Sequence, residues 1–325
     1  MNHRTNMQAD ADAPVLSLQG VSKRIGSKWI VSQLSFDVHK GEVVGLLGPN
    51  GAGKTTTIRM IAGLIGMTEG DVLVRGSSIR RDWKQAIRHI GAIIENPEFY
   101  PYMTGYDNLK QYQRMNPWIS RERIDEVVRL VGLEQAMKKK VKAYSLGMRQ
   151  RLGIAQALLH EPSVLILDEP TNGLDPAGIR EMRDYLKNIA REEGISILVS
   201  SHLLLEMEQL CSRVVVIQDG KLVTVRSIGG GSGEAEQPGQ QEAMRVMFRV
   251  GRLEEAKRLL EGLDLAEVLA VNPEQSELIL SLQYKDIPGV VERLGTGRIP
   301  IYLITELKQS LEDEFLKWTG GNQIA

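Results

Sequence analysis

The stretch VVGLLGPNGAGKT, residues 43–55, is the strongest indicator of fold in this chain. It begins with VVGLLG, a continuous apolar run that is typical of a strand buried on both faces of a sheet. GPNGAGKT, residues 48–55, then matches the pattern G-x-x-x-x-G-K-[ST], and a helical pattern continues from Thr55 to about Ile65. A buried strand, a glycine-rich turn and a helix in this order predict a phosphate-binding loop.

The residue types of this loop suit a nucleoside triphosphate. Glycines let the backbone turn tightly with its N–H groups facing a phosphate chain, and the helix N-terminus adds partial positive charge. We expect Lys54 to reach the β- and γ-phosphates and the Thr55 hydroxyl to bind Mg²⁺. The residues expected at the nucleotide are Gly48, Pro49, Asn50, Gly51, Ala52, Gly53, Lys54, Thr55 and Thr56.

Two further apolar strands end in polar groups. After VLILD, residues 164–168, Asp168 is placed to hold Mg²⁺, and Glu169 to polarise the attacking water. After ISILVSS, residues 195–201, His202 is placed to donate a hydrogen bond to the γ-phosphate. The alternatives are a helix-capping role for the two acids and a structural role for the histidine. Together with the loop, these groups predict a nucleoside triphosphatase with Glu169 and His202 as its catalytic residues.

The region beyond the loop carries two more motifs. YSLGMRQRLGIAQALL, residues 144–159, places Ser145 and Gly147 at an expected helix N-terminus, a second anion-binding end. NGLDP follows at residues 172–176. The order of phosphate loop, SLGMRQ, LDEP, GLDP and SSH resembles that of the ATP-binding-cassette ATPases, and the resemblance covers about residues 14–227.

This resemblance implies ATP as the nucleotide and a pair of cassettes as the working unit. In the family, each ATP lies between the phosphate loop of one cassette and the signature of another. By the match, Ser145 and Gly147 contact ATP in trans, and Asp175 lies across the dimer interface. The chain has one phosphate loop, so its expected partner is a second copy of itself or a homologous subunit.

The chain departs from the family pattern at two positions. Ile25 stands where an aromatic residue normally stacks on adenine, with Trp29 either a stand-in or a core residue. Glu95, in IGAIIENP, stands where the family has the glutamine that links Mg²⁺ and water to the loop touching the membrane partner. We therefore expect Glu95 near both the nucleotide and the metal, where its charge differs from that of an amide.

Glu95 and the SLGMRQ signature resemble the bacitracin-resistance and lantibiotic-immunity subgroup, as does the ending SLEDEFLKWTGG, residues 310–321. The implied function is the energising subunit of an exporter of peptide antibiotics or similar amphipathic compounds. FYPYMTGYDNLKQY, residues 99–112, carries aromatic side chains that either receive the membrane partner or pack within a helical subdomain.

Composition narrows the alternatives. The 325 residues include 40 basic and 41 acidic side chains, a balance that argues against a nucleic-acid partner. The single cysteine, Cys211, excludes an internal disulfide and fits an inert core position. No apolar stretch is long enough to span a membrane, so the expected location is the cytoplasmic face, held there by separate permease subunits. The alternative is a soluble cassette ATPase acting on ribosomes or nucleic acid, which predicts tandem cassettes, a coiled-coil insertion or a basic face.

Helices alternating with buried strands predict an α/β fold with a parallel sheet and a helical subdomain over residues 1–227. Residues 228–243 hold five glycines and no base, a composition typical of a flexible linker. Residues 244–325 then predict a small α+β domain of unknown role, with its last helix at 308–318.

Overall fold

A computed structural model describes residues 13–228, 244–261 and 265–307 of the chain. The chain divides into two compact units, one within residues 1–230 and the other within residues 231–321, and each is described by itself. Nearly all of the expected linker and the helix expected at 308–318 lie outside the described residues.

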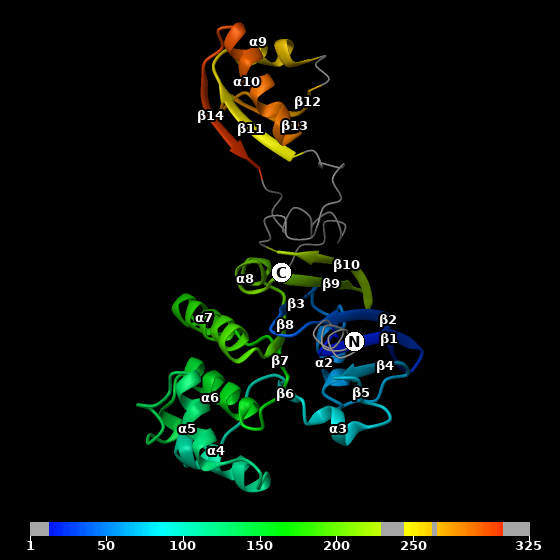
Figure 1. The fold of residues 1–325 in the computed structure, drawn as a ribbon, viewed down its shortest axis with the longest axis vertical. Helices are drawn as coiled ribbons and strands as arrows, with labels where there is room; N and C mark the ends of the chain where they lie inside the picture. Colours follow the sequence, from blue (N-terminus) through cyan, green and yellow to red (C-terminus); the bar gives the residue numbers. More distant parts are fainter. Residues whose placement is uncertain (1–12, 229–243, 262–264, 308–325) are drawn as a thin grey trace, which may run out of the picture. The chain divides into compact units, whose positions relative to one another are not determined.

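The first unit is built on a six-stranded sheet in the order β10-β9-β3-β8-β7-β6 (Figure 1). Its strands are β3 (Val43–Leu47), β6 (Ile90–Ile93), β7 (Val164–Asp168), β8 (Ser196–Ser201), β9 (Arg213–Gln218) and β10 (Lys221–Ser227). All neighbours pair in parallel except β9 and β10. Every residue of β3, β7 and β8 is buried, as their apolar sequences predict. The carboxyl ends of these three strands therefore meet at one edge of the sheet.

A second, antiparallel sheet in the same unit has the order β2-β1-β4-β5. It contains β1 (Leu16–Ile25), β2 (Lys28–Val38), β4 (Glu69–Val74) and β5 (Ser77–Ser78). The first two strands are longer than the sequence predicts, because register shifts break the alternation between polar and apolar residues on which the prediction depends. The tip of this hairpin is the pair Ile25 and Lys28.

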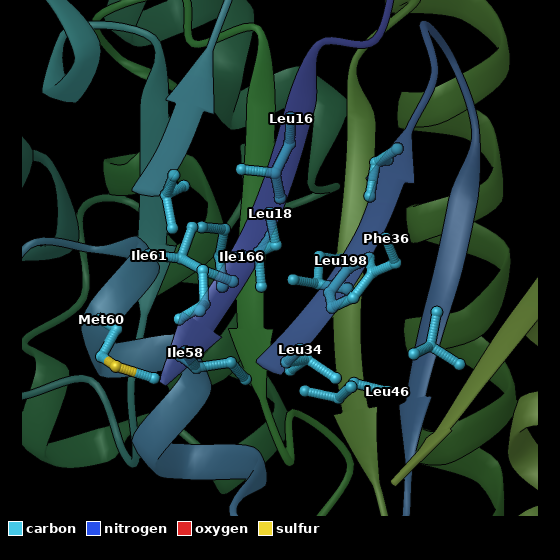
Figure 2. Close-up of a cluster of buried hydrophobic side chains, with 14 of the residues drawn as sticks. Leu16, Leu18, Leu34, Phe36, Leu46, Ile58, Met60, Ile61, Ile166 and Leu198 are labelled. Atoms are coloured by element: carbon cyan, nitrogen blue, oxygen red, sulfur yellow. The ribbon is translucent and has the colours of Figure 1, made fainter. Parts of the chain in front are cut away.

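Helix α2 (Lys54–Ile61) packs into the core that joins the two sheets. Figure 2 shows its Ile58, Met60 and Ile61 side chains among residues of β1, β2, β3, β7 and β8. Each such side chain contributes roughly 1.5–3 kcal/mol by leaving water, so the core fixes the helix that follows the phosphate loop. The helix ends before the predicted Ile65, because Gly63 adopts a φ of +69° and closes its last turn.

The remaining helices of this unit are α3 (Trp83–Ile87), α4 (Gly105–Met115), α5 (Arg121–Leu130), α6 (Leu146–Leu158), α7 (Pro176–Glu193) and α8 (Leu204–Leu210), with the 3₁₀ turn η1 (Val141–Ala143). Helices α4, α5 and α6 pack on one another as a helical subdomain (Figure 1). The predicted apolar face of α5 and the residue after it is confirmed, since Ile124, Val127, Val128 and Val131 are all buried.

The second unit has a four-stranded antiparallel sheet in the order β12-β13-β11-β14 (Figure 1). Its elements are β11 (Met244–Val250), α9 (Leu253–Leu260), β12 (Ala266–Asn272), β13 (Glu277–Leu282), η2 (Tyr284–Asp286), α10 (Ile287–Thr296) and β14 (Ile301–Glu306). This is a split β-α-β arrangement. Strand β12 was not predicted, because it is an edge strand with a register shift and no clear alternation in its sequence.

Candidate nucleotide site

The loop between β3 and α2 needs glycine at two positions. A Cβ on Gly48 would lie 2.3 Å from the carbonyl oxygen of Ile217, closer than any real contact. Gly53 has a φ of +103°, and a Cβ there would lie 3.0 Å from the carbonyl oxygen of Ile30. The loop therefore packs tightly against β9 and β2, which sets its backbone before any ligand binds.

Lys54 is the first residue of α2 and is almost fully buried. Its ammonium donates hydrogen bonds to the carbonyl oxygens of Gly48, at 2.7 Å, and Pro49, at 3.4 Å. Burial lowers the pKa of Lys54, and the carboxylates of Glu169 and Asp168 partly oppose that effect. The loop thus curls around a cation, which is the arrangement needed to hold phosphate oxygens.

Asp168 and Glu169 are held by the neighbouring strand β8. The buried Asp168 carboxylate accepts a 2.5 Å hydrogen bond from the Ser200 hydroxyl, and the Glu169 backbone N–H donates to the same oxygen at 3.1 Å. The helix-cap alternative for these two acids is wrong, because α7 begins later and Asp175 caps it. Ser200 was missed by the sequence analysis, although its place opposite Asp168 in the parallel register could have indicated it.

The Glu169 side chain lies between two positive or proton-donating groups. One carboxylate oxygen lies 3.7 Å from Nζ of Lys54, and the other lies 2.8 Å from Nδ1 of His202. Glu169 also has a φ of +50°, a strained backbone for a residue with a side chain. The structure therefore brings together the three predicted groups at the carboxyl ends of β3, β7 and β8.

The His202 contact constrains the proton on its ring. An ionised carboxylate only accepts hydrogen bonds, so Nδ1 carries the proton in the contact with Glu169. Donation from Nε2 to a phosphate oxygen at the same time requires a doubly protonated ring. His202 can thus orient Glu169 as a neutral imidazole, or bridge Glu169 and a phosphate as an imidazolium.

The donor set at this edge fits Mg²⁺. The described residues contain no cluster of three or more His, Cys, Asp or Glu side chains suited to a metal. Magnesium commonly takes one or two protein oxygens and completes its shell with water and phosphate. The half-buried Thr55 hydroxyl and the Asp168 carboxylate are ligands of that kind.

The predicted signature residues lie apart from this cluster in their bonding. The Ser145 hydroxyl accepts from the N–H of Met148 and caps α6, and the Asp175 carboxylate accepts from the N–H of Gly178 and caps α7. Within the described residues, no hydrogen bond or ion pair joins Ser145, Gly147 or Asp175 to the phosphate loop. Both capping residues are exposed, as residues that meet a second molecule must be.

Glu95 is held beside the phosphate loop's helix rather than in the cluster. Its carboxylate pairs with the guanidinium of Arg59, on α2, at 2.5 Å, and its side chain is 68% exposed. Glu95 also has a φ of +67°, so its backbone is strained. Arg59 was not identified from the sequence, which gives no local sign that an arginine on α2 faces the IGAIIENP segment.

The positions proposed for adenine stacking lie at the tip of the β1–β2 hairpin. Ile25 is 59% exposed and Trp29 is 42% exposed, so the core alternative for Trp29 is wrong. The Arg24 guanidinium lies 5.5 Å from the centre of the Trp29 ring. An exposed ring at the end of a hairpin, where no second layer of the core covers it, is available to a ligand.

Comparison with known proteins gives a consistent family. The ABC transporter family model matches residues 31–172. YhcH, an uncharacterised ABC transporter ATP-binding protein of Bacillus subtilis, is 49% identical over 94% of this chain and 96% of its own length. The bacitracin transport ATP-binding protein BcrA of Bacillus licheniformis is 38% identical over 95% of this chain and 99% of its own. The lantibiotic transport protein SrtF of Streptococcus pyogenes is 40% identical over 66% of this chain and 92% of its own.

Solved structures agree with the fold of the first unit. A dimeric ATP-binding cassette in a post-hydrolysis state, bound to ADP and Pi, has a TM-score of 0.59 at 25% identity and covers 66% of this chain and 99% of its own. A component of the ABC transporter complex cbiONQ from Clostridium perfringens has a TM-score of 0.62 at 26% identity, over 66% of this chain and 89% of its own. Among the helices described here, none combines the length and apolar character needed to cross a membrane.

Proposed function

This chain belongs to the ABC transporter family as an ATP-hydrolysing subunit, and from that premise we propose that it powers the export of peptide antibiotics or similar amphipathic compounds. The names of the bacitracin and lantibiotic relatives support this substrate class, and their similarity to the bacitracin protein extends over nearly the whole chain. The alternative of a soluble ATPase acting on ribosomes or nucleic acid has no support among the relatives reported above.

The geometry at Glu169 is the observation that carries the hydrolytic mechanism. Lys54 and the loop N–H groups hold the β- and γ-phosphates of ATP, and Thr55 and Asp168 hold Mg²⁺, which supplies charge neutralisation when bound. Glu169 accepts a proton from, or orients, the water that attacks the γ-phosphorus. His202 fixes the Glu169 carboxylate at 2.8 Å and turns with it towards the phosphate.

We propose that a second copy of the chain completes each site. Ser145 lies at the N-terminus of α6, where backbone N–H groups and the helix dipole favour an anion. Gly147 leaves this end open, since a Cβ there would contact only Leu174, at 3.7 Å. The exposure of Ser145 and Asp175 and their separation in bonding from the chain's own phosphate loop support contact in trans.

The helical subdomain offers a surface for the membrane partner. Tyr100 and Tyr102 are 54% and 61% exposed with ring centres 5.8 Å apart, which favours partner contact over packing within the subdomain. A nearby open groove of about 460 Å³ is lined by residues of α3, α4, β6 and α6, including exposed Trp83 and Trp118. We propose that a helix of a separate permease subunit binds here and holds the chain at the cytoplasmic face of the membrane.

Replacement of Glu169 by Gln tests this function. We expect cells that make the chain together with its permease to survive bacitracin or a lantibiotic, and cells with Glu169→Gln to lose that protection. Purified Glu169→Gln should bind ATP but hydrolyse it at least roughly a hundredfold more slowly, since general base catalysis contributes about 10²–10⁴-fold. Glu192→Gln, at an exposed carboxylate of α7, is the matched control and should behave as the unaltered chain. Undiminished hydrolysis by Glu169→Gln would remove its proposed role, and unaltered protection by a hydrolysis-deficient chain would remove the export role.

A further inference from the structure

The sheet of the second unit is covered on one face only by described elements. Helices α9 and α10 pack on the face formed by alternate residues of β11 and β13. The buried residues of that face and its helices are Val246, Phe248, Val250, Leu278, Leu280, Leu282, Ala256, Leu260, Val290 and Leu294. The intervening residues of the same strands point to the opposite face, against which no described helix or strand packs.

This opposite face has an apolar centre. Met247 and Ile279 are directly opposed on β11 and β13, and each is only half-buried. On the next strand Leu303 is paired with Arg249 and is 40% exposed. Arg245 lies at one end of the face and is exposed, whereas Arg249, at the other end, is paired with Glu277 at 2.8 Å. The face is therefore an apolar strip with an unneutralised positive end.

The chain's own C-terminal sequence has the complementary pattern. In KQSLEDEFLKW, residues 308–318, the apolar residues Leu311, Phe315 and Trp318 are spaced i, i+4 and i+7, as on one side of a helix. Ser310 followed by Asp313 is a capping-box pattern, and EDE at 312–314 places acids in the first turn. These acids complement the charge of Arg245.

The described end of the chain lies next to this face. Strand β14 ends at Glu306, and the N–H of Leu307 donates to the carbonyl oxygen of Arg245 at 2.8 Å. The following segment therefore starts at the positively charged end of the strip. A helix of its length extends about 16 Å, and the seven-residue strand β11 extends about 23 Å, so the helix fits along the face.

We propose that residues 308–318 form a helix that packs Leu311, Phe315 and Trp318 on the Met247–Ile279–Leu303 strip as the third layer of the second unit. The short connection from Leu307 gives the segment an effective concentration in the millimolar range. A second copy of the chain would have to compete with a ligand that is already tethered. The occupant is therefore the chain itself rather than a partner.

A pair of introduced cysteines in the full chain tests this packing. The native Cys211 is buried, and burial raises its pKa to about 12, so it leaves the background clean. We expect Ile279→Cys with Phe315→Cys to form a disulfide within one chain under mild oxidation. The control joins Phe315→Cys to Arg258→Cys, on the exposed side of α9, and should form a disulfide at a rate lower on the order of tenfold. A disulfide between two chains, or equal rates for the two pairs, would overturn the proposal.

Truncation after Leu307 provides a second measurement that does not depend on the cysteines. Loss of the segment should uncover the strip and increase the fluorescence of the dye ANS, while ATP hydrolysis by the first unit shows that the chain still folds. Arg245→Glu in the full chain should give a smaller increase, since it removes only the charge contribution. ANS fluorescence equal to that of the full chain after truncation would contradict the proposal.

Discussion

At the scale of single residues, Glu95 differs most from what its sequence position suggests. Its carboxylate is neutralised by Arg59 on the helix that follows the phosphate loop. An exposed ion pair of this kind contributes about 0–1 kcal/mol to stability, so its main effect is on the charge that faces the nucleotide. Arg59 thus offsets a negative charge that would otherwise oppose the binding of phosphates.

This reasoning predicts opposite effects for the two members of the pair. Arg59→Gln should weaken ATP binding by roughly two- to fivefold, because it leaves the Glu95 charge unneutralised. The double variant Arg59→Gln and Glu95→Gln should recover the original affinity, and Glu95→Gln alone should change ATP hydrolysis and drug protection. Titration of ATP binding by calorimetry gives the affinities. Additive effects in the double variant, or no effect of Glu95→Gln on either activity, would show that the pair has no such role.

His160 gives a prediction for pH. Burial lowers its pKa from 6.5, and its hydrogen bond to the carbonyl oxygen of Ile90 opposes this only in part. The unfolded chain therefore binds the proton more tightly, so this contribution to stability is complete above pH 6.5 and is lost as the pH falls through the lower, folded pKa. His160→Gln keeps a donor for Ile90 without the titration.

We expect the thermal midpoint of the original chain to fall more between pH 7.5 and pH 5.5 than that of His160→Gln. Burial also lowers the pKa of His89, so the variant should lose only part of the pH dependence. Thermal melts followed by circular dichroism at the two pH values make the comparison. Identical falls in both chains would contradict the assignment.

At the scale of elements, the N-terminus of α7 separates stability from assembly. Asp175 caps this helix through its bond to the N–H of Gly178, and it is also the residue proposed to lie across the dimer interface. Asp175→Ala should lower stability by about 1 kcal/mol, whereas Asp175→Asn keeps the cap. If Asp175 also works across the interface, Asp175→Asn should impair ATP hydrolysis while denaturant unfolding stays unchanged. Normal hydrolysis by Asp175→Asn would assign the residue to capping alone.

The elements that could be predicted from sequence are those with a strong local signal. The buried strands β3, β7 and β8 are continuous apolar runs, and α5 has a clear apolar side, so both kinds were expected correctly. Strand β12 and the outer half of the β1–β2 hairpin were missed, because bulges and edge positions remove the alternation. The site residues Lys54, Glu169 and His202 were found because they follow buried strands. Ser200 and Arg59 were missed because they act through pairings between distant segments.

At the scale of the whole molecule, one chain provides half of each complete nucleotide site. It contributes a phosphate loop, with Lys54 and Glu169 3.7 Å apart, and an exposed signature at Ser145 that does not bond to that loop. The near neutrality of the sequence, with 40 basic and 41 acidic residues, fits contacts that are made mainly with nucleotide and protein. ATP bound between two copies is the central claim of this account.

Sedimentation of Glu169→Gln with and without nucleotide tests that claim most directly. Gly147→Asp in the same background is the matched control, because position 147 has room for a Cβ and an acid suits the first turn of α6, but its charge repels phosphate. We predict that Glu169→Gln with Mg·ATP sediments at twice the mass of one chain, whereas the same chain with Mg·ADP, and the Gly147→Asp control with Mg·ATP, sediment as single chains. A single-chain mass for Glu169→Gln at saturating Mg·ATP, or equal pairing with ADP, would contradict the account.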